Sequence, residues 1–193
     1  MKYKLKHIAA VQTGSSFRSR LEPLSDGNVR VVQMKDLGQD NRVDLEALTR
    51  VSMRRVKAHH LLHLGDVVLR SRSHTNSAVL IDTEVEDAIV AAPLIRIRAT
   101  SKNVLPSYLC WFINQPSTQS YFQTHATGSS ARIIGKHVVE NMEVFVPSLE
   151  KQKQIVEISQ LMAKEQSLIR QLAQKRKQYF EKLLFRFAHL EEI

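Results

Sequence analysis

The chain has 193 residues, which is enough for one well-buried core, or for one core and an extended appendage. It carries 28 Lys and Arg against 19 Asp and Glu, a formal net charge of +9, and 43% of its residues are apolar. The apolar content excludes a globally disordered chain. The excess of positive charge favours an anionic partner, most commonly nucleic acid, although a basic protein without such a partner would have the same composition.

The sequence predicts a cytoplasmic protein with no membrane partner. Its single cysteine, Cys110, excludes an intramolecular disulfide and is typical of a reducing compartment. Cys110 lies in an apolar stretch, residues 109–113, and is interpreted as a packing residue and not as a catalytic thiol. No apolar run approaches the ~20 residues of a membrane-spanning helix. Gln12 and Thr13 cut short the apolar run at the N-terminus, which argues against a signal peptide.

Three short helices are predicted in the first 147 residues. The first covers residues 5–12, where apolar side chains recur at helical spacing, and Gly14 ends it. The other two begin at Pro106 and Pro116, because proline suits the first turn of a helix.

Five strands are predicted from valine-rich runs or from alternation of apolar and polar side chains. They are residues 28–34, 66–69, 78–81, 94–99 and 142–146. Strands and helices do not alternate regularly. The predicted fold is therefore an α/β (mixed α+β) domain over residues 1–147.

One long helix is predicted after Pro147 and forms a second domain, residues 148–193. No proline or glycine occurs between residues 149 and 188, and Ser148 is a suitable N-cap. Forty helical residues would extend ~60 Å at 1.5 Å per residue, which is well beyond the width of a domain of this size. Most of the helix therefore needs a partner outside the domain.

A heptad-like stripe runs along this helix, with residues at alternating steps of three and four. Its members are Ile155, Ile158, Met162, Glu165, Ile169, Leu172, Arg176, Tyr179 and Leu183. The stripe predicts a coiled-coil-like dimer or docking element, whose partner is a second copy, another helix or another protein. Glu165 and Arg176 interrupt the apolar stripe and would set the helix register by pairing across a dimer.

No catalytic residue, metal site or cofactor is predicted. The sequence has no glycine-rich dinucleotide or P-loop motif, and no adjacent prolines of the kind that amino-methylating enzymes carry. The acidic residues 82–87 have no nearby lysine, so they indicate an acidic turn and not a nuclease site. His59 and His63 are spaced for one helix face, but no third ligand accompanies them.

Four segments have the residues that contact nucleic-acid phosphates or base edges: glycine–serine turns, amides and cations. The first segment follows Gly14, and the second lies at the end of the strand at residues 28–34. The third follows the strand at residues 66–69, and the fourth follows Gly128. The candidate DNA-binding residues are Ser15, Ser16, Arg18, Arg20, Gln33, Lys35, Arg70, Ser71, Arg72, His74, Asn76, Ser129, Ser130, Arg132 and Lys136.

The alternative for each segment is an ordinary surface loop. Gly-Ser-Ser turns also occur in flexible loops, and Gln, Lys and Asp are common at the ends of strands. The third segment, residues 70–76, favours function because it has no acidic residue and directly follows an apolar strand.

The order of these segments resembles the specificity subunits of type I restriction–modification systems. The resemblance covers nearly the whole chain and is most specific in the Gly-Asp-apolar strand and in the start of the long helix. The matching segments are LKHIAAVQTG (residues 5–14), VVQMKDL (31–37), LGDVVLRSR (64–72), YLCWFIN (108–114), Gly128-Ser129 and VFVPSLEKQ (144–152).

The resemblance implies a non-catalytic DNA target recognition domain and a helix that acts as a spacer. It implies double-stranded DNA, a DNA methyltransferase (modification) subunit and a restriction subunit as partners. Such subunits usually carry two recognition domains and two helices, whereas this chain has one of each and looks like a half-subunit. A homodimer with two-fold symmetry would recognise a bipartite, inverted-repeat target.

Two other functions remain open from the sequence. One is a helix-mediated assembly, decoy or regulatory protein that has the same scaffold but does not read DNA. The other is an unrecognised nuclease. A methyltransferase gene beside this one would favour the specificity subunit, and metal-dependent cleavage by the purified chain would establish the nuclease.

Overall fold

A computed structural model describes residues 1–17, 21–38, 43–73, 75–128 and 132–189. The chain divides into two compact units, Met1–Lys153 and Gln154–Ile193. The predicted mixed α+β fold with a long C-terminal helix is confirmed. The first turn of that helix belongs to the first unit, whereas the sequence placed the division at residue 147.

A four-stranded antiparallel sheet forms the centre of the first unit, with the strand order β2-β8-β5-β6. Its registers place Ile97 opposite Val11 on one side and opposite Val67 on the other. All four strands are rich in branched apolar residues, which suit a pleated, buried surface. Their bounds are Ala9–Thr13 (β2), Val67–Arg70 (β5), Ala78–Leu80 (β6) and Leu94–Ala99 (β8).

The helix predicted for residues 5–12 is wrong beyond its first turn. Leu5–His7 form a 3-10 helix, and residues 9–13 form strand β2. Ala9 and Val11 are buried while Ala10 is exposed, a period of two that pairing with β8 imposes. The apolar residues fit either period over so short a segment, so the tertiary pairing decided the structure.

Two smaller sheets complete the strands. In the first, β3 pairs with β4 in antiparallel and with β7 in parallel orientation. In the second, β1 pairs with β9 and joins the two ends of the first unit. The sequence missed β1, β4 and β7, which are three residues each. The bounds are Lys2–Lys4 (β1), Val29–Val32 (β3), Thr49–Val51 (β4), Ala88–Val90 (β7) and Glu143–Phe145 (β9).

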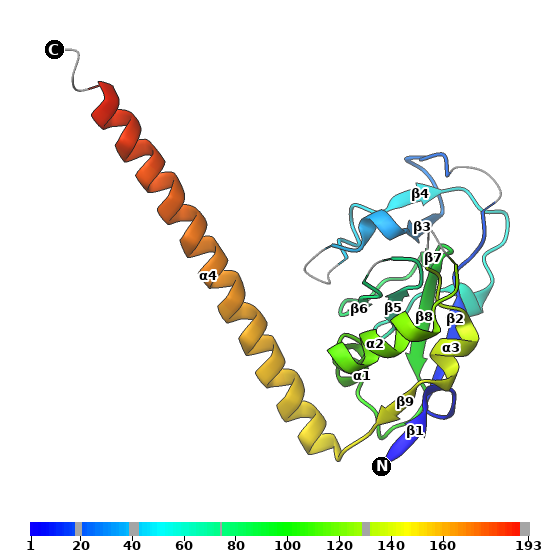
Figure 1. Ribbon diagram of the computed structural model, residues 1–193. Coiled ribbons are helices and arrows are strands. Elements are labelled where there is room, and N and C mark those ends of the chain that lie inside the picture. Colours follow the sequence, from blue (N-terminus) through cyan, green and yellow to red (C-terminus); the bar gives the residue numbers. More distant parts are fainter. Residues whose placement is uncertain (18–20, 39–42, 74, 129–131, 190–193) are drawn as a thin grey trace. The chain divides into compact units, whose positions relative to one another are not determined.

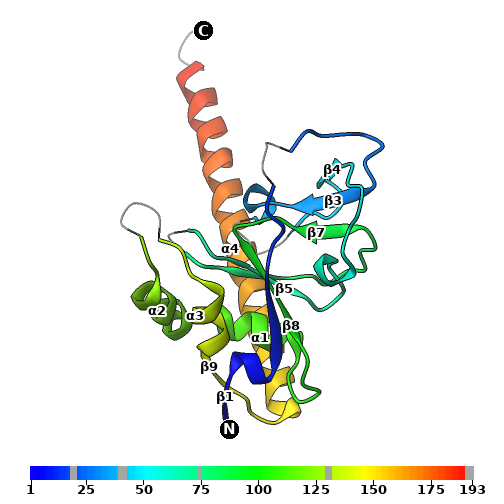
Figure 2. The same cartoon turned by 90° about the vertical axis from the view of Figure 1, so that its right-hand side faces the viewer.

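The two faces of the four-stranded sheet support different layers. Val67 and Leu69 of β5 pack with residues of three helices, whereas Val68 packs with Val32 and Val90 of the smaller sheet. In Figure 2, α2 and α3 lie on one side of β5 and β8, and β3, β4 and β7 lie on the other. The helices are Pro106–Ile113 (α1), Pro116–His125 (α2) and Lys136–Asn141 (α3).

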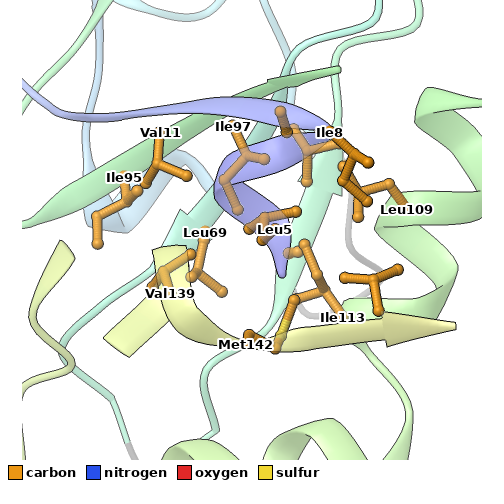
Figure 3. Close-up of a cluster of buried hydrophobic side chains, with 14 of the residues drawn as sticks. Leu5, Ile8, Val11, Leu69, Ile95, Ile97, Leu109, Ile113, Val139 and Met142 are labelled. Carbon is orange, nitrogen blue, oxygen red and sulfur yellow. The ribbon is translucent and has the colours of Figure 1, made fainter. Parts of the chain in front are cut away.

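The helical side holds the largest core cluster (Figure 3). Leu5, Leu109 and Ile113 are fully buried there, together with strand residues such as Leu69 and Ile97. Helices α1 and α2 both begin with proline, as the sequence predicted. Helix α3 is an addition that the sequence did not predict.

A buried ion-pair network lies at the start of β5. Gly65 adopts a positive φ of 87°, and the carboxylate of Asp66, 1% exposed, accepts hydrogen bonds from Nε and Nη2 of Arg98 at 2.6 and 2.7 Å. Arg96 lies 4.0 Å from the same carboxylate. Both arginines donate to the carbonyl of Leu61, at 3.1 and 2.9 Å. The network therefore joins β5 and β8 to the segment that ends at Leu61.

A buried glutamine fixes the first turn of the long helix α4 (Leu149–His189). Gln152 is fully buried; its Oε1 accepts the Leu105 amide at 2.9 Å. Its Nε2 donates to the carbonyls of Asn103 and Pro147 at 2.8 and 2.9 Å. Gln152 thus ties the helix start to the loop that precedes α1.

Helix α4 has the length that the sequence predicted and continues unbroken through the described part of the second unit (Figure 1). Glu150 lies in its first turn and Arg186 in its last, both favourable for the helix dipole. None of the helices that the structure describes is long and apolar enough to cross a membrane.

Candidate nucleic-acid interface

Three of the four predicted contact segments meet in the first unit. The amide of Ile134 donates to the carbonyl of Ser71 at 2.8 Å, and Arg72 forms a β-bridge with Ile133. The third and fourth segments therefore run side by side. The guanidinium of Arg70 donates to the carbonyl of Leu37, which holds the second segment against the third.

The first segment reaches the same region through the turn at residues 91–93. The amide of Ser15 donates to Val90 at 2.7 Å, and its carbonyl accepts from Ala92 at 2.9 Å. The hydroxyl of Ser71 donates to the carbonyl of Pro93. One turn thus separates the first segment from the third.

Four predicted cations are exposed in the structure: Lys35, Arg72, Arg132 and Lys136. Arg132 immediately precedes Ile133, the bridge partner of Arg72, so the two arginines lie on adjacent segments of the backbone. Arg132 donates to the carbonyl of Gln123 at 3.2 Å. No carboxylate among the described residues pairs with either arginine, so both guanidinium groups can bind an external anion.

The two lysines are partly engaged within the domain. The ammonium of Lys35 donates to the hydroxyl of Thr49 at 3.2 Å. Lys136 pairs with Glu140 at 3.5 Å across one helical turn of α3. Exposed pairs of this kind contribute little to stability, so a phosphate can compete for both lysines.

Two other candidates, Ser71 and Asn76, are buried and form hydrogen bonds within the domain. Ser71 is 4% exposed and Asn76 is 3% exposed. The side-chain amide of Asn76 donates to the carbonyl of Arg70 at 2.8 Å. The backbone amide of Asn76 donates to Oε1 of Gln119, and its carbonyl accepts from Nε2 of Gln119, both at 3.0 Å. These side chains hold the loop in shape, because burying them without such partners would be costly.

Arg70 and Gln33 also act mainly within the domain. Arg70 is half-buried, and its Nε is enclosed without a hydrogen-bond partner among the described residues. Gln33 caps the 3-10 helix Met34–Asp36, while its side-chain nitrogen donates to Thr49 at 3.2 Å. Ser16 is exposed and Ser15 is half-buried. The remaining candidates, Arg18, Arg20, His74, Ser129 and Ser130, lie outside the described residues.

The stripe of helix α4 is exposed over most of its length. Ile158, Met162, Ile169, Leu172 and Tyr179 are 55–63% exposed, and Ile155 and Leu183 are half-buried. The apolar face is wider than the sequence analysis described. Four further exposed apolar residues follow stripe members by three or four positions, Leu161, Leu168, Phe180 and Phe187, and Leu184 follows Phe180 by four. So wide a face is typical of a helix that packs against others.

The structure describes no cluster of side chains suited to a metal ion. No group of three or more His, Cys, Asp or Glu residues comes together among the described residues. Burial raises the pKa of the Cys110 thiol to about 12, so it stays protonated at neutral pH. Cys110 packs against the largest core cluster, as expected of a packing residue.

The fold is a mixed α+β domain with exposed cations, followed by a long helix with an exposed apolar face. A model of the family described as type I restriction modification DNA specificity domain matches residues 1–176. The chain therefore belongs to this family, and the resemblance read from its motifs is confirmed. No curated protein matches the chain.

Solved structures share the fold at low sequence identity. One is a chain from a structure that describes complex assembly and conformational transition of the type I R-M system; the TM-score is 0.68 at 18% identity, over 91% of this chain and 41% of that chain. The HsdS subunit from Thermoanaerobacter tengcongensis gives 0.59 at 16% identity, over 86% and 37%. The type I S subunit from M. genitalium gives 0.57 at 10% identity, over 83% and 38%. This chain thus spans about two fifths of the length of each.

Proposed function

We propose that this chain is a non-catalytic subunit that reads a DNA sequence and directs a partner methyltransferase, and a restriction subunit, to it. The observation that carries the proposal is the meeting of the predicted contact segments around Arg72 and Arg132. These arginines sit on neighbouring backbones of a specificity-domain fold. The likeness to a chain from a type I R-M assembly supports the choice of partners.

Arg72 and Arg132 supply the chemistry that duplex DNA requires. A guanidinium group binds a phosphate with two parallel hydrogen bonds, or reads the O6 and N7 atoms of guanine in the major groove. Lys35 and Lys136 add phosphate contacts, which fix the position of the domain without reading sequence. Binding is therefore expected to weaken steeply as salt concentration rises.

We further propose that helix α4 forms an antiparallel homodimer. A two-fold axis midway between Arg170 and Gln171 would place Ile169 opposite Leu172 of the second copy. The same axis places Met162 opposite Tyr179, and Ile158 opposite Leu183. Between Ile158 and Leu183 the stripe is thus complementary to itself when it is reversed, because its apolar residues meet apolar residues.

The two charged interruptions of the stripe fit this register. The axis places Glu165 of one copy opposite Arg176 of the other, which makes two opposite-charge pairs. A parallel dimer in register would place Glu165 opposite Glu165 and Arg176 opposite Arg176. Like charges at such positions are unfavourable, so the antiparallel arrangement is preferred. It would present the two recognition domains to the halves of an inverted repeat.

The function is tested by a methylome. The chain is co-expressed with the methyltransferase encoded beside it, and the modified host DNA is sequenced. A new split, inverted-repeat motif is expected. A split but asymmetric motif would mean that a different second recognition domain takes part. No new methylation, with both proteins soluble, would overturn the proposal in favour of an assembly or decoy protein.

A variant links this result to the proposed site. Arg72→Ala combined with Arg132→Ala should lower the methylated fraction of the motif, because both phosphate and base contacts are lost. Lys175→Ala combined with Lys182→Ala, which removes the same charge from helix α4, is the matched control and should methylate normally. Equal methylation by the wild-type chain, this variant and the control would show that Arg72 and Arg132 do not contact the DNA.

The helix register is tested by exchanging its charges. Glu165→Arg and Arg176→Glu should each weaken the dimer at least about tenfold, because each creates two like-charge pairs. The double exchange Glu165→Arg with Arg176→Glu should restore it. Sedimentation equilibrium gives the dimer dissociation constant. Gln174→Arg, on the opposite face of the helix, is the control. Failure of the double exchange to restore the dimer would exclude this register.

A further inference from the structure

A second basic surface lies outside the segments that the sequence singled out. Residues 50–60 contain four Lys or Arg and two His without any acidic residue. Arg50 pairs with Asp87 at 3.1 Å. No carboxylate of the described residues pairs with Arg55 or Lys57, and both are exposed. A count of charge along the chain would have found this run.

The segment that carries these cations is held at both ends. At its start, the side chain of Asn28 donates to the carbonyl of Met53 at 3.0 Å and accepts the Met53 amide at 2.9 Å. At its end, the carbonyl of Leu61 accepts from Arg96 and Arg98 of the buried network. A loop fixed in this way presents its cations at defined positions, so less conformational entropy is lost on binding.

The middle of the segment forms one wall of a groove of about 390 Å³. Ile89, fully buried in β7, also lines the groove, and Met53 and Val56 pack against the same small sheet. Arg55 and Lys57 line this wall. The backbone of Gly14, with Ser15 and Ser16, lines the groove as well. Cations and serine hydroxyls thus border one groove.

The groove is electropositive. The pKa of His60, which also lines it, is lowered first by burial and then by the charges of His59, Lys57 and Arg96. Those contributions mean that several positive groups lie close enough to act on one imidazole. No Asp or Glu of the described residues lines the groove, so its positive field favours an anion there.

We infer that this groove is a second binding surface for the phosphate backbone of duplex DNA, with Arg55 and Lys57 as the contacting cations. The inference rests on the proposed function and extends it. The Ser15–Ser16 segment borders the groove, and one turn, residues 91–93, separates that segment from Ser71, which precedes Arg72. A duplex held by Arg72 and Arg132 would therefore be gripped at two places, and serine hydroxyls can donate to the same phosphates.

The test measures how binding of a labelled, mixed-sequence duplex by the full chain depends on salt. Non-specific binding reports phosphate contacts and needs no knowledge of the target. Arg55→Ala with Lys57→Ala should reduce the magnitude of the slope of log K against log salt by about 1.8, since each lost contact removes about 0.9. The control is Lys4→Ala with Lys102→Ala, exposed cations near the opposite end of β2.

The outcomes separate the inference from the proposed function. A reduced slope in the groove variant, with an unchanged slope in the control, supports the groove as a phosphate site. The same slope in the wild-type chain, the groove variant and the control would overturn the assignment of the groove as a phosphate site, and the proposed function would be unaffected. If the wild-type chain does not bind duplex DNA at low salt, the proposed function is wrong and the groove assignment fails with it. Thermal unfolding of each variant checks that the fold is kept.

Discussion

Replacing Asp66 with alanine is expected to destabilise the first unit by about 3–5 kcal/mol. Asp66 is 1% exposed, and its carboxylate is the counter-ion of Arg98 and lies near Arg96. Burial lowers the pKa of Arg96, and the charge of Asp66 opposes that shift. Without the carboxylate, Arg96 remains as a buried cation without a counter-ion, and Arg98, whose side chain is 32% exposed, loses its ion-pair partner. The penalty is the cost of burying unpaired charge, which exceeds the net value of the intact pair.

The effect should reach the segment that ends at Leu61. Arg96 and Arg98 both donate to the Leu61 carbonyl and are oriented by Asp66, so their displacement releases that anchor. Urea unfolding gives the loss of stability. Asp82→Ala, at an exposed aspartate, is the matched control and should change the free energy of unfolding by less than about 0.5 kcal/mol. An Asp66 variant as stable as this control would mean that the network contributes nothing.

Replacing Gln152 with leucine is expected to cost about 3 kcal/mol. The side chain keeps nearly the same volume, but the amide of Leu105 and the carbonyls of Asn103 and Pro147 lose their partner. Each buried polar group that is left unsatisfied costs about 1–3 kcal/mol, and partial relaxation reduces the sum. Gln152 is fully buried, so water cannot replace the lost hydrogen bonds without a local opening.

Gln160→Leu provides the comparison for this variant. Gln160 is exposed on the same helix, so the identical chemical change there should alter stability by less than about 0.5 kcal/mol. Denaturant unfolding followed by circular dichroism and by Trp111 fluorescence distinguishes the two sites. Equal stability of the two variants would contradict the role of Gln152. Hydrogen exchange at Leu105 should also become faster in Gln152→Leu and not in Gln160→Leu.

These two residues show what the family resemblance detects. Asp66 belongs to the Gly-Asp-apolar strand, and Gln152 closes the V-P-x-L-E-x-Q start of the long helix. Both side chains are buried and hold separate parts of the first unit together. The most specific motifs of the sequence therefore identify the scaffold. Of the exposed cations proposed to contact DNA, Lys35 and Arg72 lie in matching segments, whereas Arg132 and Lys136 lie outside them.

The structure divides the candidate contact residues into buried and exposed ones, a division that the sequence did not reveal. Arg70 and Arg72 have the same chemistry two positions apart, and both were candidates. Arg70 ends strand β5 and is half-buried because it packs against the second segment, whereas Arg72 lies beyond the strand and remains exposed. Burial and exposure depend on which segment packs against the loop, and that segment is more than thirty residues away in the sequence.

The sequence by itself determined the helix of residues 149–189, its stripe and the proline-started helices, because these depend on local spacing and on the absence or position of proline. Only the tertiary structure decided that residues 9–13 are a strand and that Ser71 and Asn76 are buried. It also brought Ser15, Arg55 and Lys57 to one groove. Short segments satisfy more than one local pattern, and pairing between distant parts of the chain selects among them.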